Sequence, residues 1–462
     1  MRATLAIVFG CLIVSNLSAQ VMSDQQFYAL ILKNHPLAKQ AGLKLEMGES
    51  QVLKAKGGFD PKVYTDYGEK NFANTSYFQK LNSGVYLPTW YGIQLKSGFE
   101  SNRGTFVNPE NKTPYGGLFY GGVSLSLGQG LMMDQRRAEL FKAQLYQEST
   151  SYEQALMLNQ LVYESGYAYW NWFLAHHSEK VLRESYQLAL LRFNAVKLAA
   201  EGGDRPYIDT IEARIQVQSR NALWKSYETE ELNARVKVST YLWNEQLEPL
   251  DLAASKMPME ENETALPLSR FPSIMELDSL IAHHPYLKMN NLKIKTLEID
   301  QKLKKEQLKP VLNLNYQVIN EPVNYNPLYS FSPNNNKFGV QFEMPILLRK
   351  ERGDLQLSKL KIQDEQLTFT SNQVYIQSKI EQAQNDYLNA QAQVQIYQQS
   401  VLDSKTLFEA EKRMFEQGES SLFLVNAREL TYIQAKLKYL EVLTKCQQAA
   451  LSYEFSLARL IP

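Results

Sequence analysis

The feature of the chain that most limits its possible folds is a long coiled-coil pattern between Val374 and Tyr439. Its apolar and small residues alternate steps of four and three, at Ile376, Ile380, Ala383, Tyr387, Ala390, Val394, Tyr397 and Val401. This spacing averages about 3.5 residues, the period of a left-handed coiled coil. The pattern breaks at Gly418, where serines follow that can cap a new helix, and it resumes at Leu430. The segment therefore predicts a long antiparallel helical hairpin with a tight turn.

The same organisation occurs twice in the chain. The matching segments keep their order and, on each side of the strands, their separation: Asn34–Leu37 with His283–Tyr286, Asp60–Val63 with Lys309–Val311, and the turn residue Gly203 with Gly418. The first copy differs mainly by additional residues in its strand region. We therefore interpret the chain as an internal duplication.

The domain boundaries follow from this duplication. We predict a signal peptide at 1–19, a first repeat at 20–248, an inter-repeat linker at 249–272 and a second repeat at 273–462. The first repeat holds strands at about 59–128 and a helical turn at about 200–206. The second holds a β hairpin at about 310–345 and a turn at about 416–421. Each repeat thus has the order helix, strands, very long helix, turn, helix.

Six helices are expected, and two of them are unusually long. Their predicted ranges are Asp24–Lys56, Gln135–Ala199 and Pro206–Trp243 in the first repeat, and Ser273–Leu308, Arg352–Glu416 and Leu422–Leu460 in the second. A helix of about 65 residues is close to 100 Å long. Such helices do not fold around an ordinary globular core.

The first residues and the charge balance place the protein in a secretory class without a nucleic-acid partner. Arg2, an apolar run and Leu17-Ser18-Ala19 have the order of a signal peptide that is cut after Ala19. Cys11 lies inside this run, in a poor lipoprotein context, so Cys446 is the one cysteine of the mature chain and forms no internal disulfide. The 49 basic and 49 acidic residues cancel, which excludes a strong field for binding nucleic acid.

The predicted strands alternate between apolar and polar residues. In Val311–Val318, the leucines, Tyr316 and Val318 share one face, and the asparagines and Gln317 share the other. Lys337–Met344, Tyr91–Phe99 and Gly122–Leu127 repeat this pattern. Aromatic residues near strand ends suit the girdles of a membrane barrel: Trp90, Tyr91, Phe119, Tyr120, Tyr325, Tyr329 and Phe331. Soluble β sandwiches alternate in the same way, so the pattern alone leaves both possibilities open.

The number of strands indicates that several chains share one barrel. We count four strands, or six if Tyr77–Leu87 contributes a further hairpin. Neither number closes a barrel, because the smallest membrane barrels have about eight strands. Three chains with four strands each would supply twelve.

These features together resemble the outer membrane efflux protein family, the TolC-like outer membrane factors, over nearly the whole mature chain. The residues that carry the resemblance are the doubled Asn-His-Pro-Leu-type opening, Asp134–Ala138 after the strands, and the turns that lead into Asp209–Ala213 and Phe423–Ala427. The resemblance implies an α+β membrane protein. In it, a long antiparallel coiled-coil α-barrel continues into a 12-stranded transmembrane β-barrel that a homotrimer shares, with an internal two-fold repeat.

The resemblance also implies a function and its partners. It implies the outer-membrane channel component of a tripartite efflux or type I secretion system, in the outer membrane of a Gram-negative cell and extending into the periplasm. The expected partners are two further copies of the chain, a periplasmic adaptor protein, an inner-membrane transporter and outer-membrane lipid. Adaptor docking is expected at the two turns, at Gly202, Gly203, Asp204, Arg205, Gly418, Glu419 and Ser420. The exported substrate remains open.

A gate is expected at the periplasmic mouth. The candidate residues are Asp209, Glu212, Phe415, Phe423 and Asn426. Family members often carry carboxylates where this chain has Phe423 and Asn426, and an arginine and a tyrosine where it has Ser420 and Phe415. A cation-binding ring is therefore not expected here, although Asp209 and Glu212 keep acidic character.

No arrangement of a nucleophile, a base and an orienting group can be assembled, so we predict no catalysis, cofactor or metal. His35 and His284 each precede a proline and are interpreted as helix-boundary residues. His176 and His177 are adjacent and therefore point to different sides of a helix, which is poor for chelation. Two other hypotheses remain: a periplasmic adaptor (membrane fusion) protein, and a coiled-coil scaffold protein without a channel.

Overall fold

A computed structural model describes residues 20–264, 271–321, 332 and 334–461. The predicted signal peptide and the aromatic residues Tyr325, Tyr329 and Phe331 lie outside these ranges. The chain forms two compact units. The first unit comprises the chain up to Ala41, Ala155–Ile281 and the chain from Ile376 onward, and the second comprises Gly42–Gln154 and Ala282–Tyr375.

Four shorter helices occupy the positions where the sequence predicts two continuous ones. They are α1 (Asp24–Asn34), α2 (Pro36–Lys56), α5 (Ile274–His283) and α6 (Pro285–Glu306). The prediction of unbroken helices was wrong because a residue that precedes proline is disfavoured in helical geometry. His35 and His284 stand at these breaks, as predicted for boundary residues. The His35 Nδ1 atom accepts from the Leu37 amide (3.1 Å), and the His284 Nδ1 atom accepts from the Tyr286 amide (3.3 Å).

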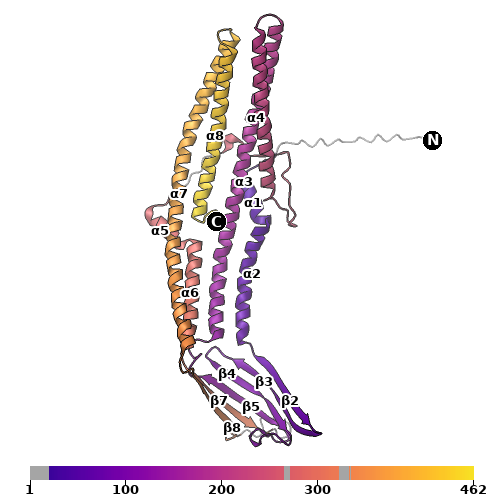
Figure 1. Ribbon diagram of the computed structural model, residues 1–462, viewed down its shortest axis with the longest axis vertical. Helices are drawn as coiled ribbons and strands as arrows, with labels where there is room; N and C mark the ends of the chain where they lie inside the picture. Colours follow the sequence, from indigo (N-terminus) through magenta and orange to yellow (C-terminus); the bar gives the residue numbers. More distant parts are fainter. Residues whose placement is uncertain (1–19, 265–270, 322–331, 333, 462) are drawn as a thin grey trace, which may run out of the picture. The chain divides into compact units, whose positions relative to one another are not determined.

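Four longer helices form two antiparallel pairs (Figure 1). They are α3 (Gln135–Glu201) with α4 (Tyr207–Ser239), and α7 (Arg349–Glu416) with α8 (Leu422–Ser456). Helices α3 and α7 have 67 and 68 residues. Ile376, Ile380, Tyr387 and Val394 of α7, four positions of the predicted seam, are buried.

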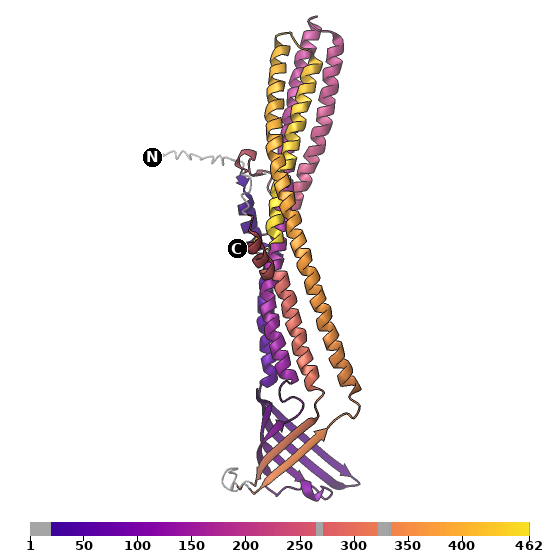
Figure 2. The ribbon, with the colours of Figure 1, turned by 90° about the vertical axis from the view of Figure 1, so that its left-hand side faces the viewer.

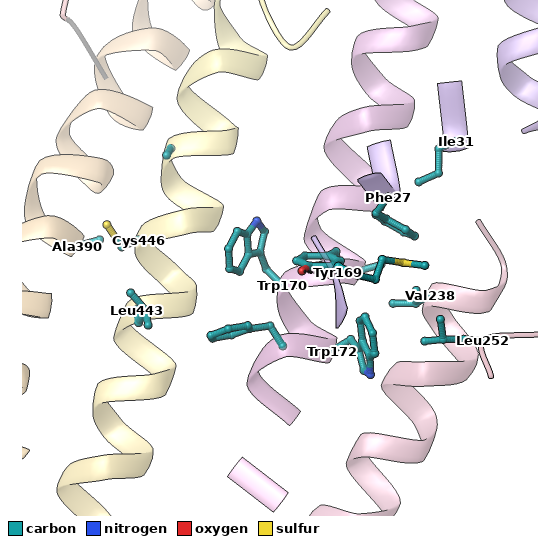
Figure 3. Packing of buried hydrophobic residues seen from close by; sticks show 14 of the residues in the cluster. Phe27, Ile31, Tyr169, Trp170, Trp172, Val238, Leu252, Ala390, Leu443 and Cys446 are labelled. Atoms are coloured by element: carbon teal, nitrogen blue, oxygen red, sulfur yellow. Dashed lines mark hydrogen bonds between the residues drawn. The ribbon is translucent and has the colours of Figure 1, made fainter. Parts of the chain in front are cut away.

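The core of the first unit is aromatic. Figure 3 shows Tyr169, Trp170 and Trp172 of α3 beside Phe27 and other residues that come from segments distant in the sequence. The hydroxyl group of Tyr169 donates to the Met22 carbonyl oxygen (2.8 Å) and accepts from the Met259 amide (3.2 Å). This buried hydroxyl thereby joins two chain segments and satisfies its own hydrogen-bonding capacity.

The described residues of the predicted inter-repeat linker contain two short elements. Strand β6 (Lys256–Pro258) pairs in parallel with β1 (Gln20–Met22), and a 3₁₀ turn, η3, covers Glu261–Glu263. Residues 265–270 lie outside the described part of the chain.

The second unit contains a six-stranded antiparallel sheet (Figure 2). Its order is β2 (Lys62–Phe72), β3 (Thr75–Pro88), β4 (Ile93–Arg103), β5 (Leu118–Ser126), β7 (Val311–Asn320) and β8 (Asn336–Glu343). Six is the larger of the two strand numbers that the sequence left open. The described sheet therefore does not have the four strands on which the expected twelve rested.

The β2–β3 hairpin is the part of the sheet whose presence the sequence left open. Ala73 and Asn74 form its two-residue turn, both with positive φ values (48° and 57°). Two consecutive residues in this conformation match the twist of a tight hairpin. Short 3₁₀ turns, η1 (Gly57–Phe59) and η2 (Pro109–Asn111), lie before β2 and between β4 and β5.

The two faces of the sheet differ in polarity across the rows that join β3, β4, β5, β7 and β8. Following the register across the strands, one row consists of Leu87, Leu95, Val123, Tyr316 and Phe338. The adjacent row, on the opposite face, consists of Tyr86, Lys96, Gly122, Gln317 and Lys337. The predicted alternation is confirmed, and the apolar face is exposed in the single chain, with Phe338 63% accessible.

Among the described residues, none of the helices combines the length and the apolar character that crossing a bilayer requires.

Candidate functional site

The two turns between the long helices have the same backbone geometry. Gly203 and Gly418 adopt left-handed conformations with φ values of 84° and 83°, as predicted for Gly418. At the first turn the Asp204 amide donates to the Ala199 carbonyl (2.9 Å), and at the second the Glu419 amide donates to the Met414 carbonyl (2.9 Å). This backward bond across the glycine is the Schellman closure of a helix.

The second turn is also held by side chains. Ser421 caps α8 by accepting from the Leu424 amide (3.3 Å). The Ser420 hydroxyl donates to the Glu411 carboxylate, which also lies 3.8 Å from the Arg428 guanidinium. Ser420 therefore fixes the turn to the helix that precedes it, and its hydroxyl is already engaged.

The two turns contact each other through a small mixed cluster. Arg205 lies 3.7 Å from the Asp209 carboxylate and 4.4 Å from the centre of the Phe415 ring. Phe415 also packs against a buried apolar cluster of Val196 from α3, Ala213 from α4 and Leu422 from α8. Three of the predicted residues, Arg205, Asp209 and Phe415, are thus brought together at the joint between the hairpins.

A buried group of charges lies further from the turns. The Glu429 carboxylate of α8 forms two ion pairs. Its oxygens lie 2.6 Å from the Arg192 guanidinium nitrogen of α3 and 2.7 Å from that of Arg220 of α4. Arg192 also donates to the Asn426 Oδ1 atom (2.7 Å), and Arg220 donates to the Ser185 hydroxyl (2.7 Å). We call Arg192, Arg220 and Glu429 the charge triad. It joins both helices of the first hairpin to the second hairpin.

The charge triad was not predicted, because the heptad spacing was traced through apolar and small residues. A signal was available: Arg220 lies one heptad after the buried Ala213, and Glu429 continues the three-and-four spacing of Leu422 and Val425. A charge at a buried seam position is costly unless it is paired. Its presence there predicts an oppositely charged partner on the facing helix.

The remaining predicted residues are dispersed. Asn426 is buried (6% exposed) and bonded to the charge triad, whereas Phe423 is 68% exposed. Glu212 is half-buried on α4. Gly202, Asp204 and Glu419 are exposed at the turns.

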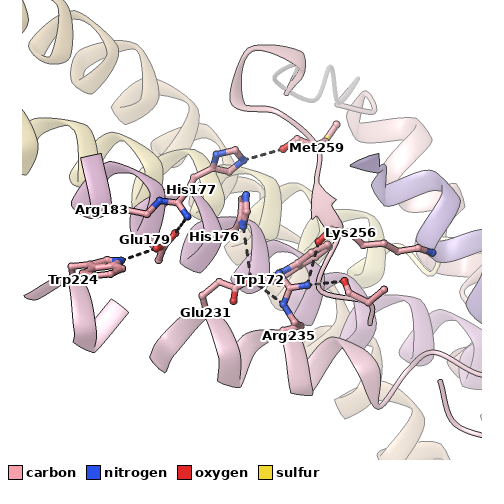
Figure 4. Close-up of polar contacts among 11 residues, drawn as sticks. Trp172, His176, His177, Glu179, Arg183, Trp224, Glu231, Arg235, Lys256 and Met259 are labelled. Atoms are coloured by element: carbon pink, nitrogen blue, oxygen red, sulfur yellow. Dashed lines mark hydrogen bonds and ion pairs between the residues drawn. The ribbon is translucent and has the colours of Figure 1, made fainter. Parts of the chain in front are cut away.

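A second polar cluster lies in the first unit (Figure 4). The Glu231 carboxylate accepts from Arg235 (2.6 Å) and Trp172 (3.4 Å) and lies 3.8 Å from His176. Burial raises the pKa of Glu231, but bonds from His176 and Arg235 outweigh it and hold the pKa at about 2. Arg235 also donates to the Ala253 and Lys256 carbonyl oxygens, at 2.9 and 3.3 Å. The cluster therefore fastens the linker to α4.

The two adjacent histidines have different partners, as predicted from their adjacency. His176 faces Glu231, whereas the His177 Nε2 atom bonds the Met259 carbonyl (3.0 Å) (Figure 4). Burial lowers the pKa of His177. Within the described ranges, no three histidine, cysteine, aspartate or glutamate side chains gather as a metal site.

The fold is that of bacterial outer-membrane channels. The open state of the MtrE outer membrane channel of Neisseria gonorrhoeae matches with a TM-score of 0.70 and 12% identity, over 94% of this chain and 88% of that one. The CmeC outer membrane channel of Campylobacter jejuni matches with a TM-score of 0.64 and 14% identity, over 95% and 87%. The outer membrane protein VceC of Vibrio cholerae gives 0.64 and 11%, over 94% and 96%.

No protein-family model matches the sequence, and no curated protein is detectably similar to it. The likeness to solved structures is therefore a likeness of fold. At that level it confirms the TolC-like, helix-rich α+β architecture that the sequence predicted.

Proposed function

We propose that the protein is the outer-membrane channel of a tripartite efflux or type I secretion system, a passive exit duct for a substrate chosen by its pump. The observation that carries the proposal is the match of nearly the whole chain to outer-membrane channels. The two-faced sheet supports it, because an exposed apolar face opposite a polar face suits lipid on one side and water on the other.

In this proposal the chain acts as a homotrimer, because a sheet of six strands cannot close a membrane barrel alone. The two efflux repeats, 20–248 and 273–462, each supply one helical hairpin to a hollow coiled-coil barrel in the periplasm. The segment 1–19 is a signal peptide that is removed on export. Conduction through such a duct requires no enzyme chemistry and no cofactor.

The exposed turns are the proposed contact with a periplasmic adaptor protein, which links the channel to an inner-membrane transporter. Their rigid closure supports this role: each turn ends its helix with the same backbone bond. Gly202, Asp204 and Glu419 offer exposed backbone and charge at these ends.

The charge triad is the proposed lock of the periplasmic mouth. Glu429 is buried and forms ion pairs with two arginines of the other hairpin. Unpaired charges in such a buried position are strongly unfavourable. Movement of one hairpin against the other must break these contacts. Adaptor binding at the turns would supply the energy for that step.

Fractionation with channel recording tests the function. The expected result is a heat-modifiable trimer in the outer-membrane fraction that conducts ions in a planar bilayer. A soluble periplasmic monomer without conductance would instead support an adaptor or a coiled-coil scaffold.

Glu429→Gln tests the lock, with Glu201→Gln as its control, since Glu201 is exposed near the end of α3. Losing the Glu429 charge leaves Arg192 and Arg220 without their counter-charge, so we expect a several-fold rise in channel conductance. The control channel should conduct like the original. Unchanged conductance of the Glu429→Gln trimer would exclude the triad as the lock.

A further inference from the structure

The sheet ends in two strands whose outer sides carry no strand of the described chain. Strands β2 and β8 are the outer members, and each pairs with one neighbour, β3 and β7. Most of their residues are exposed, including Val63 and Tyr67 on β2 and Phe338 and Phe342 on β8. An exposed edge of this length is a template for pairing with another chain.

The two edges are complementary in direction. All five pairings between neighbouring strands are antiparallel, so β2 and β8, at opposite ends of six strands, run in opposite directions. Rotation about an axis along the barrel preserves strand direction. The β8 strand of one copy would therefore meet the β2 strand of the next as an antiparallel pair, and repeated head-to-tail contacts of this kind close a ring.

The faces are complementary as well. Val63 and Tyr67 lie on the apolar face, and Phe338, Val340 and Phe342 lie on the same face at the other edge. Asp66 of β2 and Gln341 of β8 lie on the polar face. An antiparallel junction between the edges thus continues both faces without interruption.

We infer that the trimer closes an eighteen-stranded barrel, in which β8 of each copy pairs with β2 of the next. This inference rests on the proposed function. It differs from the twelve strands expected from sequence because the β2–β3 hairpin is counted in the wall. Barrel diameter grows roughly linearly with strand number, so the pore would be about half as wide again.

The contacts of the β2–β3 hairpin show that it is an integral part of the sheet. Strand β3 pairs with β4 from Gln79–Arg103 to Pro88–Gln94. Tyr120 of β5 donates to the Asn82 Oδ1 atom of β3 (2.8 Å), and its hydroxyl also bonds that of Tyr64 on β2. The Tyr120 hydroxyl can occupy this position because residue 98 is glycine. A Cβ atom at Gly98 would come within 2.5 Å of that hydroxyl. A twelve-stranded barrel would have to break all of these contacts.

Disulfide crosslinking tests the inference in the full-length protein. Asp66→Cys is combined in turn with Lys337→Cys, Gln341→Cys and Glu343→Cys, which all lie on the polar face and sample the unknown register. Within one chain these strands are five spacings, or about 24 Å, apart, whereas a disulfide needs Cα atoms within about 7 Å. Any bond formed therefore joins two copies. Cys446 is fully buried and can remain.

We expect one register to convert most of the outer-membrane protein into dimers and trimers on non-reducing gels, reversed by reductant. Thr65→Cys with Gln341→Cys is the control, because these residues lie on opposite faces and should stay monomeric. Lys96→Cys on β4 with the same β8 cysteines tests the twelve-stranded alternative.

Crosslinks from Lys96→Cys would overturn the inference, because β8 would then meet β4. A membrane trimer in which no Asp66→Cys combination crosslinks would also overturn it, while leaving the channel function intact. Absence of any membrane trimer would instead contradict the proposed function itself.

Discussion

The first unit and the sheet of the second unit differ in the solvent exposure of their large apolar side chains. Tyr169, Trp172 and Phe173 of the first unit are completely buried within one chain. Val340 and Phe342 of the sheet lie on its exposed apolar face. A contiguous exposed apolar face is typical of contact with a membrane or with another protein.

The difference separates two sources of stability. The first unit builds its core, which is rich in aromatic residues, from its own segments, so this packing needs no other molecule. In the sheet, by contrast, Phe338, Val340 and Phe342 of the apolar face are exposed, and no described strand pairs with the outer side of β2 or β8. Stability of the sheet should therefore depend on lipid and on assembly, and the following substitutions test that division.

The largest expected effect is at Phe173, compared with Phe338. Phe173→Ala removes a side chain that is 0% exposed and should cost about 3–5 kcal/mol, seen as a lower unfolding temperature by circular dichroism. Phe338→Ala makes the same chemical change at a 63% exposed position and should change helix unfolding much less. If both variants lowered the unfolding temperature equally, the proposed difference between the buried core and the exposed sheet face would be wrong.

The next largest effect is expected on the yield of outer-membrane trimer, when arginine is placed on one or the other face of β8. Val340→Arg places a charge on the apolar face of β8, where a lipid-facing arginine costs about 2–4 kcal/mol, so the yield of outer-membrane trimer should fall. Gln341→Arg, one residue further on the polar face, should leave that yield nearly unchanged. Similar yields for both variants would argue against lipid at the apolar face.

The third prediction asks whether polar contacts also hold the first unit. The pKa of Glu231 is about 2, below its ordinary value of 4.5, because bonds from His176 and Arg235 outweigh the effect of burial. A depressed carboxyl pKa contributes stability that is complete above about pH 4.5 and is lost as the pH falls toward 2. The contribution is on the order of 3 kcal/mol at most.

Unfolding temperatures of the original protein and of Glu231→Gln, measured from pH 6 down to about pH 2, test this prediction. The difference between them should shrink steadily below pH 4.5. Glu230→Gln, at an exposed neighbour on α4, serves as the control and should show little difference at any pH. A pH-independent gap for Glu231→Gln would mean that its effect is one of packing.

The smallest effect on stability is expected at the turn. Gly418→Val forces a β-branched residue into a left-handed conformation, at a cost of about 1–2 kcal/mol, whereas Gly418→Asn is better tolerated there. The valine variant should reduce export in a substrate-resistance assay while the outer-membrane trimer persists, and the asparagine variant should export nearly normally. Normal export by the valine variant would count against the turn as a docking surface.

Several local features of the fold could be predicted from particular residues. The spacing of Ile380 and Tyr387 predicted a buried seam, Gly418 predicted the turn, and His35 before a proline predicted a helix boundary. The sequence did not reveal β2, because Thr65 shares the apolar face with Val63 and Tyr67 and weakens the alternation. Asn426 was predicted as a gate residue, but its buried partner Arg192 was not.

The sequence by itself determined the long helices, their turns and the two-faced strands, because each depends on the periodicity of neighbouring residues and on the backbone preferences of glycine and proline. Only the tertiary structure decided the number of strands in the sheet and the partners of Glu429. Both depend on residues far apart in the chain, and no local pattern records which distant strand or which arginine will lie alongside.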